Sequence, residues 1–140
     1  MTETTQRAGY SQRPLAAKLG IKAHDRCAVL QTPSNYRDLI APLPEPLFLV
    51  TALVQNLNFV HFFTTARAEL MAQFPHLKAA ILKDGMIWIS WPKRSAKAVT
   101  DLDETVVRTI GLEQGLVDVK VAAIDHFWSG LKFVYRKADR

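Results

Sequence analysis

Three sets of side chains that could hold a ligand each follow an apolar segment of the chain. They come after residues 27–30, 58–63 and 86–90. In order, the sets are Gln31, Thr32, Ser34 and Asn35; Thr64 and Thr65; and Trp91, Lys93 and Arg94. If these segments are neighbouring strands of one open sheet, their carboxyl ends meet at one edge, where such sheets bind ligands. The amides of a helix that starts near Ser34, together with Lys93, could then hold an anion such as phosphate.

The candidate ligand-binding residues are therefore Gln31, Ser34, Asn35, Thr64, Trp91 and Lys93. A second interpretation remains open for the hydroxyl side chains among the three sets. Ser and Thr are common N-cap residues, so Thr32, Ser34, Thr64 and Thr65 could serve only to start helices.

His61 lies inside the most apolar of these segments. Alternation of side chains along a strand places it on the same face as Phe59 and Phe63. A histidine there could act as a general base. We favour a hydrogen-bonded core histidine, because the neighbouring residues on the strand are apolar.

The sequence predicts no catalytic residue and no metal site. The other histidines are placed at loop or helix ends, without a spacing that would form a metal site: His24, His76 and His126. The chain has one cysteine, Cys27, so an internal disulfide and a cysteine-based zinc site are excluded. Cys27 is expected to be a small buried side chain.

The tryptophans are expected to lie in different surroundings. Trp88 and Trp91 are three residues apart on one strand, so they should face opposite sides of the sheet. We expect Trp88 in the core and Trp91 at the end of the strand. Trp128 is expected in a hairpin connection, where it would either form an exposed partner surface or cover the sheet edge.

The elements that position these residues can be predicted from apolar spacing and from Gly and Pro. Helices are expected from Ser11 to Leu19, from Thr32 to before Pro42, from Thr64 or Thr65 through Pro75 to Gly85, and from Thr100 or Asp103 to 111–115. Strands are expected at 27–31, 47–50, 58–63, 86–91, 117–124 and 130–135. This alternation predicts an α/β fold with a three-layer, open, twisted sheet of about six strands. We expect it to be mostly parallel, in the order 2-1-3-4-6-5, with an antiparallel C-terminal hairpin.

Residues 1–10 are expected to be a disordered or frayed tail, followed by a single domain over 11–140. No apolar run approaches the roughly 20 residues that span a bilayer. The first residues contain no apolar signal-peptide segment, so we expect a cytoplasmic protein without membrane contact.

The formal net charge is +5 and the isoelectric point is near 9.6. A basic chain can attract nucleic acid or smaller anions. Along the sequence, however, basic residues alternate with acidic ones, and no RNA-binding or zinc-finger motif is present. Nucleic acid is therefore not an expected partner. An anionic small molecule, an unknown protein partner and self-association through a sheet edge remain candidates.

The order of elements over residues 58–136 resembles the second half of class I S-adenosylmethionine-dependent methyltransferases. The resemblance rests on Phe59–Phe63, Leu82-Lys-Asp-Gly-Met-Ile-Trp-Ile-Ser90, Gly115–Lys120 and Leu131–Arg136. Those enzymes typically have Leu-Lys-Pro-Gly-Gly before a strand and end in a hairpin with an antiparallel last strand. The chain also resembles a small bacterial family of uncharacterised domains that share YSQRPLAAKLGI, FVHFF and WISWPK, for which no activity is established.

The methyltransferase resemblance implies a glycine-rich turn after the first strand and an acidic residue at the end of the second. Here the turn is Gln31-Thr-Pro-Ser-Asn-Tyr36, without glycine, and the second strand ends in Val50-Thr51-Ala52, without an acid. Binding of S-adenosylmethionine in the usual mode, or of another cofactor, is therefore not expected. We expect a non-catalytic, methyltransferase-like (Rossmann-like) module for binding or partner interaction. The alternatives are a small enzyme or binder acting on a phosphate-bearing molecule, and a nucleic-acid accessory protein.

Overall fold

The computed structural model describes residues 13–140, so the predicted tail and the Ser11 helix start lie outside the described residues. The helices are α1 (Leu15–Leu19), α2 (Tyr36–Ile40), α3 (Arg67–Ala80) and α4 (Glu104–Glu113), with short 3-10 helices η2 (Arg94–Ala96) and η3 (Lys137–Asp139). The strands are β1 (Arg26–Leu30), β2 (Phe48–Val50), β3 (Leu57–Phe63), β4 (Ile81–Pro92), β5 (Leu116–Ala123) and β6 (Trp128–Tyr135).

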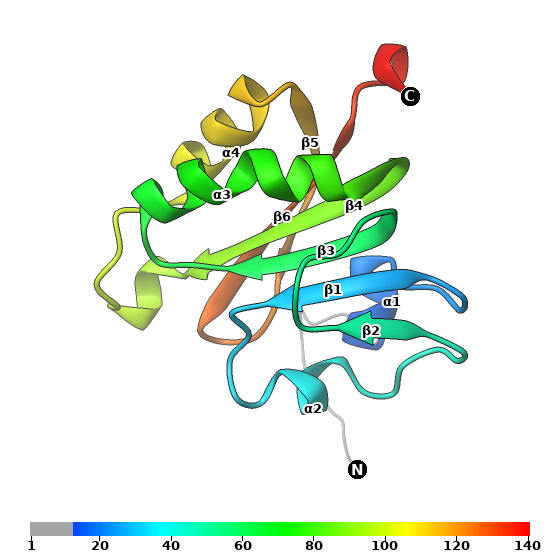
Figure 1. The fold of residues 1–140 in the computed structure, drawn as a ribbon. Coiled ribbons are helices and arrows are strands. Elements are labelled where there is room, and N and C mark those ends of the chain that lie inside the picture. The colour runs from blue at the N-terminus through cyan, green and yellow to red at the C-terminus, as the bar shows by residue number, and fades with distance from the viewer. Residues whose placement is uncertain (1–12) are drawn as a thin grey trace.

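The six strands form one sheet in the order β2-β1-β3-β4-β6-β5 (Figure 1). Strands β1 to β4 are parallel, and β6 runs antiparallel between β4 and β5. The predicted α/β fold class, strand order and closing antiparallel hairpin are all confirmed. The carboxyl ends of β1, β3 and β4 consequently lie at one edge of the sheet.

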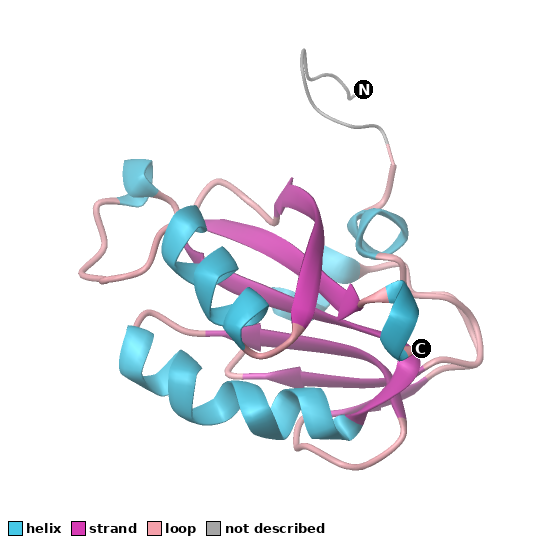
Figure 2. Ribbon diagram, turned by 90° about the horizontal axis from the view of Figure 1, so that it is seen from above, coloured by secondary structure: helices cyan, strands magenta, loops and turns pink. Residues whose placement is uncertain are grey.

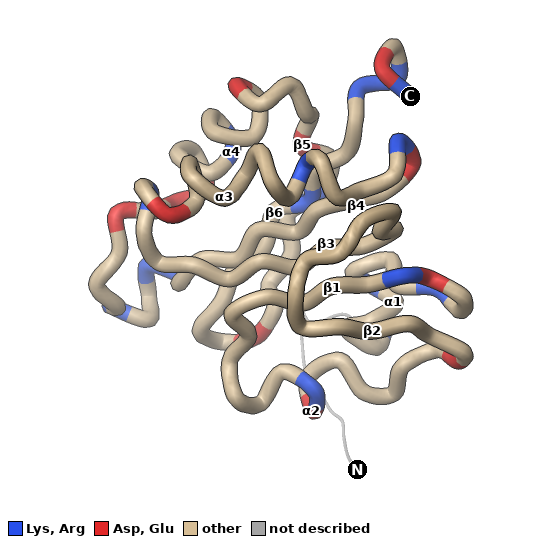
Figure 3. The backbone as a smooth tube through the Cα atoms, in the orientation of Figure 1, with Lys and Arg blue, Asp and Glu red and all other residues tan. Residues whose placement is uncertain are grey.

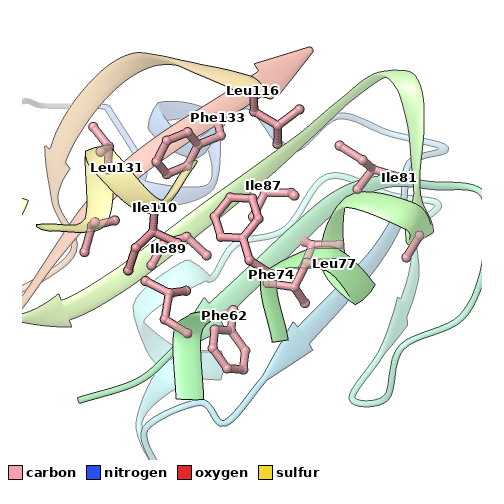
Figure 4. Close-up of a cluster of buried hydrophobic side chains, with 14 of the residues drawn as sticks. Phe62, Phe74, Leu77, Ile81, Ile87, Ile89, Ile110, Leu116, Leu131 and Phe133 are labelled. Carbon is pink, nitrogen blue, oxygen red and sulfur yellow. The ribbon is translucent and has the colours of Figure 1, made fainter. Parts of the chain in front are cut away.

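Helices cover both faces of this sheet (Figure 2). Helices α3 and α4 pack on one face through a cluster of buried apolar side chains that includes Phe74, Ile110 and Phe133 (Figure 4). Helices α1 and α2 pack on the other face, where Leu19 and Tyr36 are buried. Burial of both faces explains why β3 and β4 read as almost continuous apolar runs.

The helix predicted after the first strand begins later than expected. Residues 32–35 form a turn in which the Tyr36 amide donates to the Pro33 carbonyl (3.0 Å). Asn35 is the N-cap of α2, so Pro33 does not occupy the first helical position. Gln31, directly after β1, has a left-handed backbone (φ 56°), so the chain turns sharply before residues 32–35.

The helix predicted to end at Gly85 in fact ends at Ala80, and β4 begins at once with Ile81. Ile81 pairs with Leu57 of β3, and the register shifts before Phe59 pairs with Met86. A Cβ at residue 85 would lie 2.8 Å from the Leu57 carbonyl oxygen. Gly85 therefore permits close approach of two strands and does not stop a helix.

Candidate functional site

The carboxyl ends of β1 and β3 meet where the strand order reverses, which is the ligand position in many open α/β sheets. In this chain the polar side chains there bind one another. The Gln31 amide donates to the Phe63 carbonyl (2.8 Å) and to a carboxylate oxygen of Glu69 in α3 (3.1 Å). The Thr64 hydroxyl donates to the same oxygen (2.5 Å). Gln31 and Thr64 are thus brought together, with Glu69 as a third member that the sequence analysis missed.

Ser34 and Asn35 are exposed on the turn before α2 and do not line the β4 pocket described below. The Asn35 side chain makes no capping hydrogen bond, and α2 has only five residues. The predicted role of Ser34 as a helix cap is also wrong, since the cap position is Asn35. The anion site expected at the start of this helix has no support in the geometry.

An open pocket lies at the carboxyl end of β4, between this strand and the start of α4. Its volume is about 360 Å³. The lining residues are Trp91, Pro92, Lys93, Arg94, Ala98, Thr100, Asp101, Leu102 and Asp103. Two of the predicted ligand-binding residues, Trp91 and Lys93, therefore line the same pocket. We call it the β4 pocket.

The β4 pocket carries both signs of charge, because Lys93 and Arg94 share it with Asp101 and Asp103. One oxygen of Asp103 accepts from the Val106 amide (2.9 Å) and so caps α4. The second carboxylate oxygen of Asp103 makes no hydrogen bond within the described residues.

The other pocket carboxylate, Asp101, ties the loop before α4 to α3. One of its oxygens accepts from the Arg67 amide (2.7 Å). The Thr100 hydroxyl donates to the Thr65 carbonyl (2.6 Å), which holds the same loop in place. Thr100 and Asp103 were predicted as the start of a helix. In the structure Asp103 caps α4, and Thr100 lies in the loop before it.

A second polar group is sealed inside the core beneath α2. Tyr36 Oη lies 2.8 Å from His61 Nδ1, and His61 Nε2 lies 2.7 Å from Ser90 Oγ. A neutral imidazole donates with one nitrogen and accepts with the other, so both hydroxyls are satisfied. Burial lowers the pKa of His61 to about 3. This confirms the hydrogen-bonded core histidine, and no ligand can reach the ring because it is completely buried.

The three tryptophans only partly follow the predictions. Trp88 is buried, with its indole N–H donating to the Leu19 carbonyl (2.8 Å). Trp91 lies on the opposite face, as predicted, and is also buried. Trp128 is the first residue of β6 and packs edge-on against Phe63, with ring centroids 5.1 Å apart. The prediction that it lies in the hairpin connection is therefore wrong.

Across residues 13–140, no three His, Cys, Asp or Glu side chains gather in a way that could hold a metal ion. Cys27 is buried in β1, and burial together with the nearby Asp25 raises its thiol pKa to about 12. Over the same residues, no helix is long and apolar enough to cross a membrane.

No protein-family model matches the chain, and no curated protein matches it by sequence. Solved structures do match its fold. A SAM-dependent methyltransferase from Aquifex aeolicus has a TM-score of 0.59 at 12% identity, over 85% of this chain and 86% of that one. The DhpI–SAH complex has a TM-score of 0.58 at 10% identity, over 89% and 84%. Magnesium protoporphyrin IX methyltransferase from Synechocystis PCC 6803, with bound SAM, has a TM-score of 0.57 at 12% identity, over 87% and 74%. The chain therefore has a methyltransferase-like fold.

This comparison contradicts the expectation that S-adenosylmethionine does not bind. Matched structures hold SAM or SAH on the same fold, so binding of this cofactor is compatible with the fold. The argument from the missing glycines was too strong. Gln31 adopts the left-handed backbone (φ 56°) that glycine usually supplies, so the chain turns sharply after β1 without one.

Proposed function

We propose that this chain is a small-molecule-binding module with a methyltransferase-like fold, and that the β4 pocket is its site. The observation that carries the proposal is that Lys93 and Arg94 line one cavity of about 360 Å³ together with Asp101 and Asp103. That volume lies within the range of roughly 300–1,000 Å³ that is usual for ligand sites. Trp91 contributes an apolar wall beside the charges.

A pocket with both signs of charge suits a ligand that also carries both. A carboxylate or phosphate would lie against Lys93 and Arg94, and an ammonium or hydroxyl group against Asp101 and Asp103. SAM is the first probe to use, because matched structures contain it and because its methionine part has both an ammonium and a carboxylate. Inorganic phosphate and free methionine separate the contributions of the two charges.

Two side chains capable of acid–base chemistry lie outside the β4 pocket. His61 is sealed in the core, between Tyr36 and Ser90. Glu69 accepts from both Gln31 and Thr64 at the end of β3. Neither group lines the β4 pocket, so neither could serve there as a general acid or base.

The test is a thermal-shift and calorimetric titration of the protein with SAM, SAH, methionine and phosphate. A ligand at a hundredfold excess over its Kd should stabilise the fold by about 2.7 kcal/mol, a shift of several degrees. Lys93→Ala should weaken binding at least tenfold. Lys137→Ala removes the same charge from an exposed site in η3 and should leave binding unchanged.

No shift with any of the four probes, or equal binding by wild type and Lys93→Ala, would contradict the proposed pocket. Conversion of SAM to SAH by the protein would favour the enzyme alternative over a binding module. Native mass spectrometry of freshly purified protein would show a co-purified ligand directly.

A further inference from the structure

Lysines that are far apart in the sequence gather on the α1 side of the sheet. We call this group the lysine patch, and its members are Lys18, Lys22, Lys93, Lys120 and Lys132. Lys18 belongs to α1, and Lys22 follows this helix. Lys120 and Lys132 are directly opposite each other on β5 and β6. All five side chains are exposed or half-buried, so a partner in solution can reach them.

Hydrogen bonds hold the patch together around the end of α1. The Lys120 ammonium donates to the Lys18 carbonyl (2.9 Å), and the Lys18 ammonium donates to the Ala123 carbonyl (3.5 Å). A Cβ placed on Gly20 would lie 3.8 Å from Lys132 Nζ, so Lys132 reaches the same helix end.

The charges of the patch act on one another. Burial lowers the pKa of Lys18, and the positive charges of Lys120 and Lys93 lower it further, followed by that of Arg13. Burial also lowers the pKa of Lys132, followed by the charges of Lys120 and Lys22. The five ammonium groups thus form one electrostatic unit.

Among the described residues, none of the five lysines forms an ion pair, although Asp25 lies beside Lys22, and Asp101 and Asp103 share the β4 pocket with Lys93. The ion pairs found in this part of the chain are those of Arg108 with Glu104 and Asp118. Like charges opposite each other on neighbouring strands destabilise a sheet, so the pairing of Lys120 with Lys132 has a cost. An anionic partner would remove that cost.

The patch also accounts for the basic character of the chain. The sequence has 18 Lys and Arg and 13 Asp and Glu, which gives a net charge of +5. Five lysines on one surface equal this excess, and the remaining charges balance. The order of charges along the sequence therefore does not show that lysines from separate segments gather in the fold. Figure 3 shows further Lys and Arg on the turn at the start of β4 and on the C-terminal segment.

We propose that the lysine patch binds the phosphate backbone of nucleic acid. Phosphate contacts need exposed cations and no base-specific groups, which is what five lysines provide. An acidic protein surface is the less fitting partner, because lysine is depleted in protein–protein interfaces and aromatic anchors are enriched there. The prediction from the sequence disfavoured nucleic acid, but it rested on the order of charges along the chain alone.

The test is fluorescence anisotropy with a short DNA duplex at several salt concentrations. Five phosphate contacts predict a slope of about −4.5 for log K against log [salt]. Affinity should then fall about 500-fold between about 50 and 200 mM salt. Lys120→Gln with Lys132→Gln removes two contacts, so the slope should become about −2.7 and the fall about 40-fold.

The matched control is Arg37→Gln with Lys137→Gln, which removes the same net charge from exposed positions on α2 and η3. It should keep the wild-type slope. Thermal unfolding checks that the variant folds. Removal of the like-charge pair raises its stability and loss of the hydrogen bond from Lys120 to the Lys18 carbonyl lowers it, so the Lys120/Lys132 variant should melt close to the wild-type temperature.

Absence of wild-type binding at low salt would overturn the proposal, as would equal loss of affinity in the control. Tighter binding of polyglutamate than of a duplex with the same number of charges, with the same dependence on Lys120 and Lys132, would show that an acidic protein is the partner instead and would also overturn it.

Discussion

The stability of the fold should fall as the pH is lowered from 7 to 5, because His61 stays neutral when it is folded. Burial lowers the pKa of its imidazole from 6.5 to about 3, and both ring nitrogens are hydrogen-bonded to hydroxyl groups. In the unfolded chain the same ring takes up a proton near pH 6.5. Protons therefore favour the unfolded state between these two pKa values.

The sign and size follow from the two pKa values. The contribution of His61 is fully present above pH 6.5 and is lost as the pH falls toward 3. Below pH 6.5 the loss is about 1.4 kcal/mol per pH unit. Integrated from pH 7 to pH 5, it is about 2 kcal/mol, which is a large part of the 5–15 kcal/mol typical of a domain.

Urea unfolding of the wild type and of His61→Gln at pH 7 and pH 5 measures this contribution. The glutamine can still donate and accept, but it does not titrate. The other titratable groups contribute equally in both proteins. On acidification the free energy of unfolding should therefore fall by about 2 kcal/mol more in the wild type than in the variant. Equal losses would refute the argument. If the variant does not fold, an NMR titration of the wild type should still find the His61 ring neutral at pH 5, and a protonated ring there would refute it as well.

Two further experiments, one substitution and one labelling measurement, test the packing of the sheet. Gly111→Ala should destabilise the protein by about 1–3 kcal/mol, because the added methyl group would overlap the buried Phe133 ring. Thermal unfolding measures this loss of stability, and an unchanged midpoint would contradict the prediction. Cys27 should not react with a thiol reagent at pH 8 in the folded protein, because it is completely buried and its pKa is raised to about 12. It should react at once in the urea-unfolded chain. Rapid labelling of the folded protein would contradict the prediction and show that β1 opens.

The sheet could be predicted from the sequence because its signals are local. Short apolar segments bounded by Gly and Pro mark the strands, and the rules for connecting them leave few topologies. The junction between α3 and β4 could not be predicted in this way. Gly85 looks like a helix stop in the sequence, and only the approach of Leu57 from β3 shows that it belongs to a strand. Contacts between distant residues decided that boundary.

The candidate site shows the same limit. Trp91 and Lys93 could be predicted because they lie at the end of β4 and directly after it. Asp101 and Asp103 reach the β4 pocket from a loop that returns to the strand end, and the sequence carries no local sign of that return. His61 was predicted correctly as a buried residue, but Tyr36 and Ser90 as its partners depend on how α2 and β4 pack.

The position of the β4 pocket follows from what happens at the ends of β1 and β3. A ligand there would compete with Gln31, whose side chain already bridges the Phe63 carbonyl and Glu69. Thr64 adds a third donor–acceptor pair, so opening this point would break several hydrogen bonds at about 1 kcal/mol each. The pocket at β4 needs no such rearrangement, because the bonds made by Asp101 and Asp103 each leave one carboxylate oxygen available. A ligand would therefore enter at lower cost beside Lys93 than at the point where the strand order reverses.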